Sequence, residues 1–298
     1  MHPKNNDILK NYIIITENAI DAVFSSDIAP KTSLSDAMRY SLEAGGKRIR
    51  PSLVMEFCRV VSGDYKKSTD AAVAIEMIHT FSLIHDDLPC MDNDDFRRGK
   101  PSCHKKFDEA IALLAGDALE NFAFRVIISS DYDDKTKSRL LSELSDATAR
   151  MIDGQVKDLS FLERGSLSED ELLEMYSLKT CALIECSAVM GCICGGADES
   201  KIVSAREYAR NLGLAFQIRD DILDVIGNEK ELGKPIGSDA DNNKTTIVSV
   251  LGIEKASELA EKYRNIALDK LENFENNGFL KDLTKSLLER YKYRGIRI

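Results

Sequence analysis

The sequence predicts an all-α protein, and three observations support this fold class. Apolar residues recur three and four positions apart through most of the chain, which is the period of a helix that buries one face. No segment shows the convincing alternation of apolar and polar residues that marks a half-buried strand. Glycine and proline, which interrupt helices, number only 17 and 6 among 298 residues.

Boundary signals support the individual helices along the chain. Gly45 and Gly46 end the second helix, and Pro51 can open the third because the first turn leaves its N–H groups unpaired in any case. Ser168 and Glu171 form the pattern of a capping box at a later helix start. The expected helices span residues 7–26, 34–45, 52–62, 69–88, 106–130, 135–159, 168–196, 199–225, 245–251, 254–275 and 279–292.

Two segments, residues 71–84 and 180–196, are apolar around most of the helical circumference. Helices of this kind belong in the interior of a bundle rather than at its surface. No Gly/Ser/Pro-rich linker divides the chain. A single domain spanning residues 1–298 is therefore expected.

Composition excludes some classes of function. Forty basic and 50 acidic residues give a formal net charge of −10, which argues against a general nucleic-acid-binding protein. No apolar run of about 18 residues is present, so no membrane span is expected. The first residues do not have the pattern of a signal peptide, which indicates a cytoplasmic protein.

The seven cysteines do not form a recognisable framework. Their number is odd, they include no C-x-x-C pair, and no histidine lies near the group from Cys181 to Cys194. Packed, reduced thiols explain them better than a zinc site at Cys192 and Cys194 does.

Two aspartate-rich clusters are the most informative feature. The first contains Asp86, Asp87 and Asp92, where Pro89 interrupts the helix and the chain has to bulge to bring Asp92 back. In the second cluster, Asp220 and Asp224 are four residues apart and share one helical face, with Asp221 beside them. The helix that carries this second cluster is otherwise apolar, which disfavours a merely solvated acidic face. Grouped carboxylate oxygens suit Mg²⁺, which keeps waters and accepts phosphates.

Basic residues accompany the acidic clusters. The segment 45–51 contains Lys47 and Arg50 at a loop-to-helix junction, where glycines and a helix N-terminus can favour an anion. His79 stands seven residues before Asp86, two turns down the same helix face. The alternative explanations are an exposed basic turn and a hydrogen-bonded core histidine.

Taken together, these motifs resemble the trans-isoprenyl diphosphate synthases, the short-chain prenyltransferases of the farnesyl and geranylgeranyl type. The resemblance covers nearly the whole chain, and the motifs occur in the family's order. They are residues 45–51, the aspartate-rich segment with Arg97-Arg98-Gly99, residues 114–118, Gly154-Gln155 with Asp158, Lys179-Thr180, Gln217 with residues 220–224, Gly233-Lys234, and Asn243-Lys244.

The resemblance implies the isoprenoid synthase fold, a helical bundle with a central substrate cavity between two Asp-rich helices. It implies that the six aspartates bind two or three Mg²⁺ ions, for which Mn²⁺ can substitute, around an allylic diphosphate. It further implies a homodimer, diphosphate substrates and the following roles. Allylic diphosphate binds Arg97, Lys179, Lys234 and Lys244; isopentenyl diphosphate binds Lys47, Arg50, His79 and Arg98; and Lys179, Thr180 and Gln217 stabilise the carbocation.

By the same resemblance, metal-assisted departure of diphosphate creates an allylic cation, which the double bond of isopentenyl diphosphate attacks. Phe81, five residues before Asp86, lies about 7–8 Å down the helix. In this family a bulky aromatic at that place limits the product to fifteen carbons, so farnesyl diphosphate is the expected product. Phe81 could instead pack in the core while another helix sets the limit.

Three alternatives stay open at this point. Geranylgeranyl diphosphate synthase differs only in product length, and a non-catalytic regulatory subunit would keep the fold while losing acidic ligands. A terpene cyclase or a head-to-head synthase fits less well, because both clusters are aspartate-rich and a second diphosphate site is present. The role of the basic C-terminal tail, residues 292–298, is not indicated by the sequence.

Overall fold

The computed structural model describes residues 1–161, 164, 167–226 and 245–288. The chain divides into two compact units. The first comprises residues 1–6, 146–188 and 198–298, and the second comprises residues 7–145 and 189–197.

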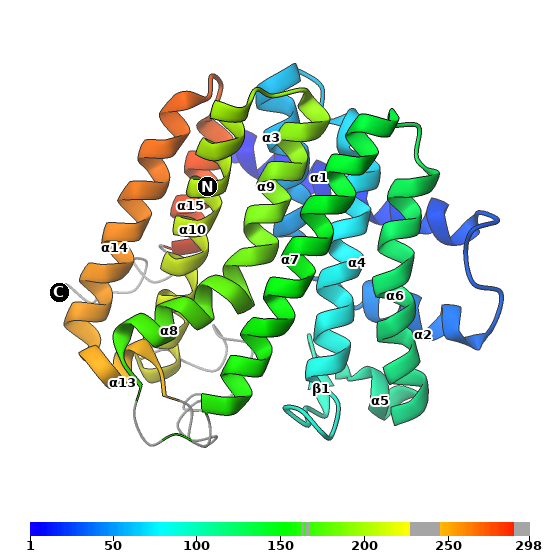
Figure 1. The fold of residues 1–298 in the computed structure, drawn as a ribbon, viewed down its shortest axis with the longest axis horizontal. Helices are drawn as coiled ribbons and strands as arrows, with labels where there is room; N and C mark the ends of the chain where they lie inside the picture. Colours follow the sequence, from blue (N-terminus) through cyan, green and yellow to red (C-terminus); the bar gives the residue numbers. More distant parts are fainter. Residues whose placement is uncertain (162–163, 165–166, 227–244, 289–298) are drawn as a thin grey trace. The chain divides into compact units, whose positions relative to one another are not determined.

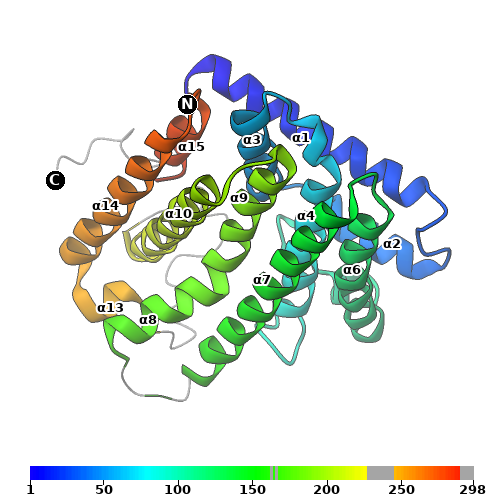
Figure 2. The same ribbon diagram turned by 45° about the horizontal axis from the view of Figure 1, so that its top comes forward.

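The second unit is built from the N-terminal helices. Its elements are α1 (Pro3–Ser25, whose first residues belong to the first unit), α2 (Ser33–Leu42), α3 (Ile49–Ser62), the 3₁₀ turn η1 (Lys66–Ser68), α4 (Thr69–Asp86), β1 (Phe96–Arg97), β2 (Lys100–Pro101), α5 (Cys103–Lys106) and α6 (Glu109–Ser129). Helix α4 packs against α3 and α6, and it lies beside α6 in Figures 1 and 2. Its side chains from Ala71 to Ile78 are all buried, as the apolar circumference predicts.

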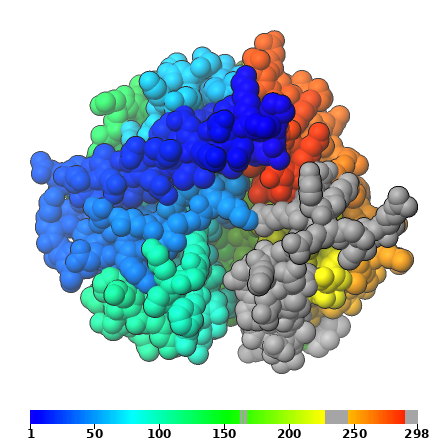
Figure 3. All heavy atoms as spheres, turned by 180° about the vertical axis from the view of Figure 1, so that it is seen from behind, coloured from blue at the N-terminus to red at the C-terminus, as the bar shows by residue number. Residues whose placement is uncertain are grey.

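Helix α1 is an amphipathic surface helix. Its buried positions are Tyr12, Thr16, Ile20 and Phe24, spaced four residues apart along one stripe. In Figure 3 the dark blue atoms of α1 run along the surface of the molecule. The Tyr12 hydroxyl donates a hydrogen bond of 2.8 Å to buried Glu56, which anchors the helix to α3.

The first unit contains the C-terminal helices. Its elements are α7 (Asp134–Phe161, whose first turns belong to the second unit), α8 (Glu169–Tyr176), the π-helical turn η2 (Ser177–Cys181), α9 (Ala182–Gly195, whose last residues belong to the second unit), α10 (Glu199–Ile226), α13 (Ile247–Leu251), α14 (Ile253–Lys270), the 3₁₀ turn η3 (Leu271–Asn273) and α15 (Gly278–Leu288). Helix α10 packs along α14, and both views show the two side by side. An apolar cluster that includes Leu172, Ile218 and Ile247 joins α8, α10 and α13.

The expected all-α class and the positions of the helices agree with the structure, and the Ser168–Glu171 capping box is present. The structure corrects four details. The expected helix 168–196 is interrupted by η2, and the expected helix 106–130 breaks at Asp108, which caps α6 through Ile111 N–H at 2.7 Å. The second helix ends earlier, at Leu42, and the fourth ends at Asp86.

A further correction concerns strands, since a short antiparallel hairpin pairs Phe96 with Pro101 and Arg97 with Lys100. Its two-residue turn has Arg98 and Gly99 at φ values of 55° and 76°. Positive φ at both positions suits a tight hairpin, because that turn follows the twist of the strands. Two-residue strands are too short to produce an alternating pattern, so the sequence did not reveal them.

The segment from Glu169 to Gly195 is long and apolar enough to cross a bilayer by length and composition, although 72% of its most apolar window is buried inside the structure. Core helices of soluble proteins meet the same criterion, so this is weak evidence for a span.

The cysteines are free thiols, and no group of three metal-binding side chains is found among the described residues. Five of the seven cysteines are buried, as expected for packed thiols, whereas Cys90 is exposed and Cys194 is half-buried.

Candidate active site

The first acidic cluster sits where α4 ends and the chain turns back. Met91 N–H donates to the Leu88 carbonyl, and Asp92 N–H donates to the Asp86 carbonyl, each at 2.9 Å. The bulge expected after Pro89 is therefore present, and it brings the backbone of Asp92 next to that of Asp86. Their side chains are respectively exposed and half-buried.

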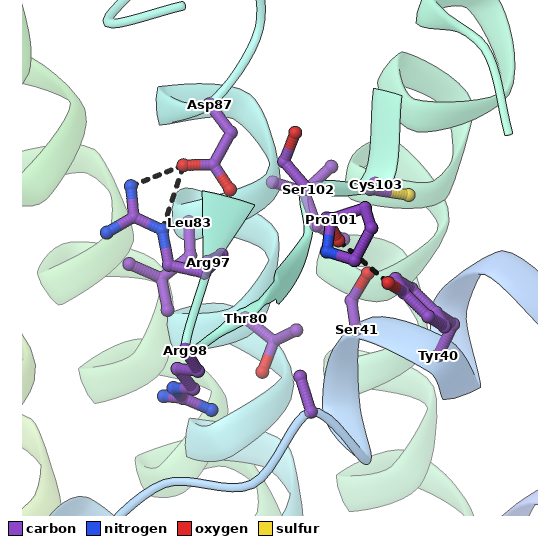
Figure 4. Close-up of a pocket in the computed structure, with 12 residues that line it drawn as sticks. Tyr40, Ser41, Thr80, Leu83, Asp87, Arg97, Arg98, Pro101, Ser102 and Cys103 are labelled. Carbon is purple, nitrogen blue, oxygen red and sulfur yellow. Dashed lines mark hydrogen bonds and ion pairs between the residues drawn. The ribbon is translucent and has the colours of Figure 1, made fainter. Parts of the chain in front are cut away.

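Asp87, by contrast, points into the protein. Its carboxylate is buried and accepts hydrogen bonds from the Nε and Nη2 atoms of Arg97, as Figure 4 shows. Burial raises the pKa of Asp87, and the bonds from Arg97 oppose that shift. Arg97 also bonds to Asp94 at 3.0 Å. The first hairpin strand is thus held against the end of α4, and Asp87 orients Arg97 in this structure.

Arg98, the turn residue of the hairpin, lies against the glycine loop that follows α2. Its guanidinium donates to the Gly45 carbonyl. A Cβ on Gly46 would come within 2.7 Å of the Arg98 guanidinium carbon, and Gly46 has a φ of 128°. Backbone conformation therefore favours glycine at this position, whereas the flexible end of the Arg98 side chain could move away from an added Cβ.

Cations surround His79. Burial holds the pKa of His79 well below its usual value, and the charges of Arg50, Arg98, Arg48 and Arg97 lower it further. A neutral imidazole offers one N–H donor and one acceptor nitrogen. Three of the four residues expected to bind isopentenyl diphosphate, Arg50, His79 and Arg98, are thus close enough to interact. The fourth, Lys47, is exposed on the same loop.

The second acidic cluster lines a cavity of about 200 Å³ in the first unit. Of the sequence-predicted residues, Lys179, Thr180, Gln217, Asp220 and Asp221 line it together. The remaining lining residues are Asp158, Met175, Tyr176, Thr245 and Thr246. Asp224 of the same cluster is buried.

Hydrogen bonds connect the polar groups around this cavity. Lys179 Nζ donates to Asp158 at 2.5 Å, and the Thr180 hydroxyl donates to Gln217 Oε1 at 3.0 Å. The Gln217 amide in turn donates to Asp221 Oδ1 at 3.1 Å. The carbonyl oxygen of Gln217 and the hydroxyl of Thr180 are thereby fixed as dipoles beside the cavity.

Tyr176 is a site residue that the sequence analysis missed. Its hydroxyl donates a hydrogen bond to Asp221 Oδ2. The Ile247 N–H group lies 3.2 Å from the Tyr176 hydroxyl oxygen and 3.2 Å from the same Asp221 Oδ2 atom. All three groups are buried. Asp221 therefore joins α8, α10 and the first turn of α13 in this structure. A tyrosine 45 residues away in sequence carries no pattern that would have identified this partner.

The π-helical turn η2 sets the place of Lys179 and Thr180. Gly154 of α7 packs directly against it, since a Cβ there would lie 2.3 Å from the Lys179 backbone nitrogen. π-helical turns inside α-helices frequently occur at functional sites. The extra residue in the turn changes which side chains share a face, so Lys179 and Thr180 both line the cavity.

Phe81 is buried on α4, and its ring meets the ring of His85 edge to face at a centroid distance of 5.2 Å. His85 Nε2 lies 3.0 Å from the Leu113 carbonyl of α6. The Phe81 ring is therefore held in a defined orientation below the first acidic cluster. Lys234 and Lys244, also predicted site residues, lie outside the described residues.

The two acidic clusters belong to different units, so the expected cavity between them stays a prediction. The same holds for the metal role of each aspartate. Mg²⁺ needs only one or two carboxylates together with substrate phosphates and waters. Asp86 and Asp92, whose backbones meet in the second unit, and Asp220, which lines the cavity of the first unit, each offer carboxylate oxygens that suit this ion.

Comparisons with known proteins decide the family. A family model described as polyprenyl synthetase matches residues 31–283. The chain belongs to this family. Polyprenyl synthetases are prenyltransferases of isoprenoid biosynthesis, and the chain is a trans-prenyl synthase of the chain-elongating type. The resemblance noted from the motifs is thus confirmed.

Individual relatives agree with this assignment. The chain is 44% identical over 285 residues to the large subunit 1 of heterodimeric geranylgeranyl pyrophosphate synthase from Arabidopsis thaliana, covering 92% of this chain and 76% of that protein. It is 44% identical over 273 residues to geranylgeranyl pyrophosphate synthase from Capsicum annuum, covering 89% and 74%.

Solved structures share the isoprenoid synthase fold. A geranylgeranyl pyrophosphate synthetase from Pyrococcus horikoshii has a TM-score of 0.86 at 32% identity, covering 96% of this chain and 98% of that one. A putative farnesyl-diphosphate synthase from Marinomonas has a TM-score of 0.79 at 36% identity, covering 94% and 98%. The polyprenyl synthetase fold expected from the motifs is therefore confirmed.

Proposed function

We propose that this polyprenyl synthetase condenses isopentenyl diphosphate head to tail with dimethylallyl and geranyl diphosphate in a Mg²⁺-dependent reaction. The cavity of about 200 Å³ carries the proposal, because it combines an ammonium, a carboxylate and two oriented oxygen dipoles. An ammonium suits a departing diphosphate, and oxygen dipoles suit the allylic cation left behind. Bound Mg²⁺ would supply additional positive charge for the leaving group.

The residues of the second unit complement this chemistry. The neutral His79 and the cations around it suit a diphosphate that binds without metal. In this proposal they form the binding site for isopentenyl diphosphate. In our proposal Asp86, Asp92 and Asp220 carry most of the metal ligation. Asp87 and Asp221 hold Arg97 and α13 in place while adding negative charge.

The proposed product is (E,E)-farnesyl diphosphate, because a buried aromatic ring stands about 7–8 Å down α4 from the first acidic cluster. The sequence relatives are named as geranylgeranyl pyrophosphate synthases, which supports the longer geranylgeranyl product better than this one. Geranylgeranyl diphosphate is therefore the second candidate. The two differ only in how much chain fits beyond the ring of Phe81.

Product analysis distinguishes the candidates. The purified protein is given isopentenyl diphosphate with dimethylallyl, geranyl or farnesyl diphosphate, with and without Mg²⁺. Fifteen-carbon product from the first two starters, absent without Mg²⁺, supports farnesyl synthesis. Twenty-carbon product would establish the second candidate, and no condensation by folded protein would favour a non-catalytic subunit.

Phe81→Ala tests the ring itself and should lengthen the product, because it removes the side chain that limits the growing chain. Phe122→Ala is the matched control, since Phe122 is also buried and meets Phe24 edge to face at 5.5 Å. Both variants should lose about 3–5 kcal/mol of stability. A Phe81→Ala protein with unchanged product length would contradict the role given to this ring.

A second copy of this chain is the proposed partner, and the cytoplasm is the proposed location. One similar protein is by its name the large subunit of a heterodimer, so a different partner subunit is the competing possibility. The mass of the purified protein in solution tests the homodimer. A monomer that becomes active only when another subunit is added would contradict it.

A further inference from the structure

Arg48 lies within the basic segment 45–51 but does not face solvent. Its backbone adopts the left-handed conformation, with a φ of 47°, immediately before the first turn of α3. Only 1% of its side chain is exposed. A left-handed arginine is uncommon, and burial of its charge is costly unless the guanidinium is paired.

The guanidinium of Arg48 is held by partners from two neighbouring elements. Its Nη1 atom lies 2.7 Å from Glu76 of α4, whose side chain is 2% exposed, and its Nη2 atom donates to the Leu42 carbonyl at 2.5 Å. Glu17 of α1 is a more distant partner, at 3.9 Å. The Arg48 carbonyl accepts the Ser52 hydroxyl at 2.7 Å, which closes the start of α3.

These contacts join the two segments that carry the isopentenyl-binding candidates. Lys47 and Arg50 flank Arg48 along the chain, so the position of its backbone limits where both can lie. Glu76 precedes His79 by three residues and therefore lies on nearly the same face of α4. The ion pair thus fixes the glycine loop and the start of α3 relative to His79.

We propose that the buried Arg48–Glu76 ion pair is a positioning device for isopentenyl diphosphate, which sets the spacing between Lys47 and Arg50 on one side and His79 on the other. Neither member contacts the substrate. The proposal rests on the proposed function of this site, because it names the residues that shape one of its two diphosphate subsites.

The energetics favour a positioning role over a purely stabilising one. A buried ion pair gains little net stability compared with apolar residues of the same volume, because desolvation offsets the attraction. What the pair does provide is direction, since a guanidinium donates its hydrogen bonds in its own plane. Tight, directional bonds to α4 and to the end of α2 are suited to holding a binding loop in one geometry.

The test compares two matched substitutions, Glu76→Gln and Glu56→Gln. Glu56 is also buried and also paired with an arginine, Arg59 at 2.7 Å, but it lies on α3 outside the basic segment. Michaelis constants are measured separately for isopentenyl diphosphate and for geranyl diphosphate, together with the thermal unfolding temperature. Direct binding of isopentenyl diphosphate is measured by calorimetry.

We expect Glu76→Gln to raise the KM and the Kd for isopentenyl diphosphate by about 10-fold or more, with little change in the KM for geranyl diphosphate. Glu56→Gln should lower the unfolding temperature without changing the KM for isopentenyl diphosphate relative to the KM for geranyl diphosphate. Arg48→Lys keeps the positive charge but loses the planar set of guanidinium N–H donors. Its KM for isopentenyl diphosphate should therefore lie between the values for wild type and Glu76→Gln.

Equal changes in both KM values, or no change, would overturn the proposal. If Glu76→Gln does not fold, the double substitution Arg48→Met with Glu76→Leu replaces the pair by apolar side chains that such sites usually tolerate. A folded double variant with a normal KM for isopentenyl diphosphate would also overturn it. Wild-type protein without condensation would instead refute the proposed function, so the two failures are distinguishable.

Discussion

Gly154→Ala tests whether the π-helical turn positions the groups around the cavity. An added Cβ would lie 2.3 Å from the Lys179 backbone nitrogen and 2.6 Å from its Cα atom. Ordinary van der Waals contact begins at 3.4 Å, so α7 and the turn must separate by about 1 Å. Backbone atoms cannot rotate away as a flexible side chain would.

The size of the effect follows from this displacement. Overpacking of this kind costs about 1–3 kcal/mol of stability, and a misplacement of about 1 Å at reacting groups can lower the rate roughly 100-fold. We therefore expect kcat at saturating substrates to fall by about two orders of magnitude while the protein stays folded. Steady-state kinetics and urea unfolding measure the two quantities.

Gly191→Ala is the matched control for Gly154→Ala. A Cβ on Gly191 would lie 2.3 Å from the Val54 carbonyl oxygen, which is an equally close approach to backbone. Gly191 lies ten residues after the end of the π-helical turn along the chain. Similar losses of stability with a large fall in kcat only for Gly154→Ala would support the reasoning, and equal falls in kcat would refute it.

Three further predictions concern the described residues. Tyr176→Phe removes the hydroxyl that bonds to Asp221, which should cost about 1–3 kcal/mol in urea unfolding; an unchanged unfolding free energy would contradict the buried hydrogen bond. Hydrogen bonds from the N-cap serine of α8 lower the pKa of Glu171 from 4.5 to about 2, so its stabilisation is present above about pH 4.5 and is lost as pH falls towards 2. Glu171→Gln should therefore lower the unfolding temperature at pH 7 and have a smaller effect near pH 3. Cys90 is exposed, whereas burial raises the pKa of Cys194 to about 12; mass spectrometry after brief iodoacetamide treatment at pH 8 should find Cys90 modified first, and early modification of Cys194 would contradict its environment.

Helical periodicity accounts for one contact beside the cavity in the first unit. Gln217 and Asp221 are four residues apart, so a helix places them on one face, and the structure joins them by a hydrogen bond at 3.1 Å. The family resemblance, rather than spacing, placed Lys179 and Thr180 beside them, and both line the same cavity. Local spacing is sufficient here because helix geometry relates neighbours of this kind directly.

The sequence could not show which residues of distant segments contact one another. Asp87 was expected to bind metal, which stays a prediction, and the structure shows that it anchors Arg97 of a hairpin that has no sequence signal. Tyr176 and Ile247 meet on Asp221, although they are 71 residues apart. Buried partners at such separations depend on how helices pack, which periodicity does not encode.

The sequence by itself determined the fold class, the order of the helices and the family, because helical period and short motifs are local properties of the chain. Only the tertiary structure decided the π-helical turn, the burial of Arg48 against Glu76, and the seating of Gly154 on the Lys179 backbone. Each of these depends on the close approach of two segments that are distant in sequence. Close packing fixes such approaches to within a fraction of an ångström, and no pattern within either segment contains that information.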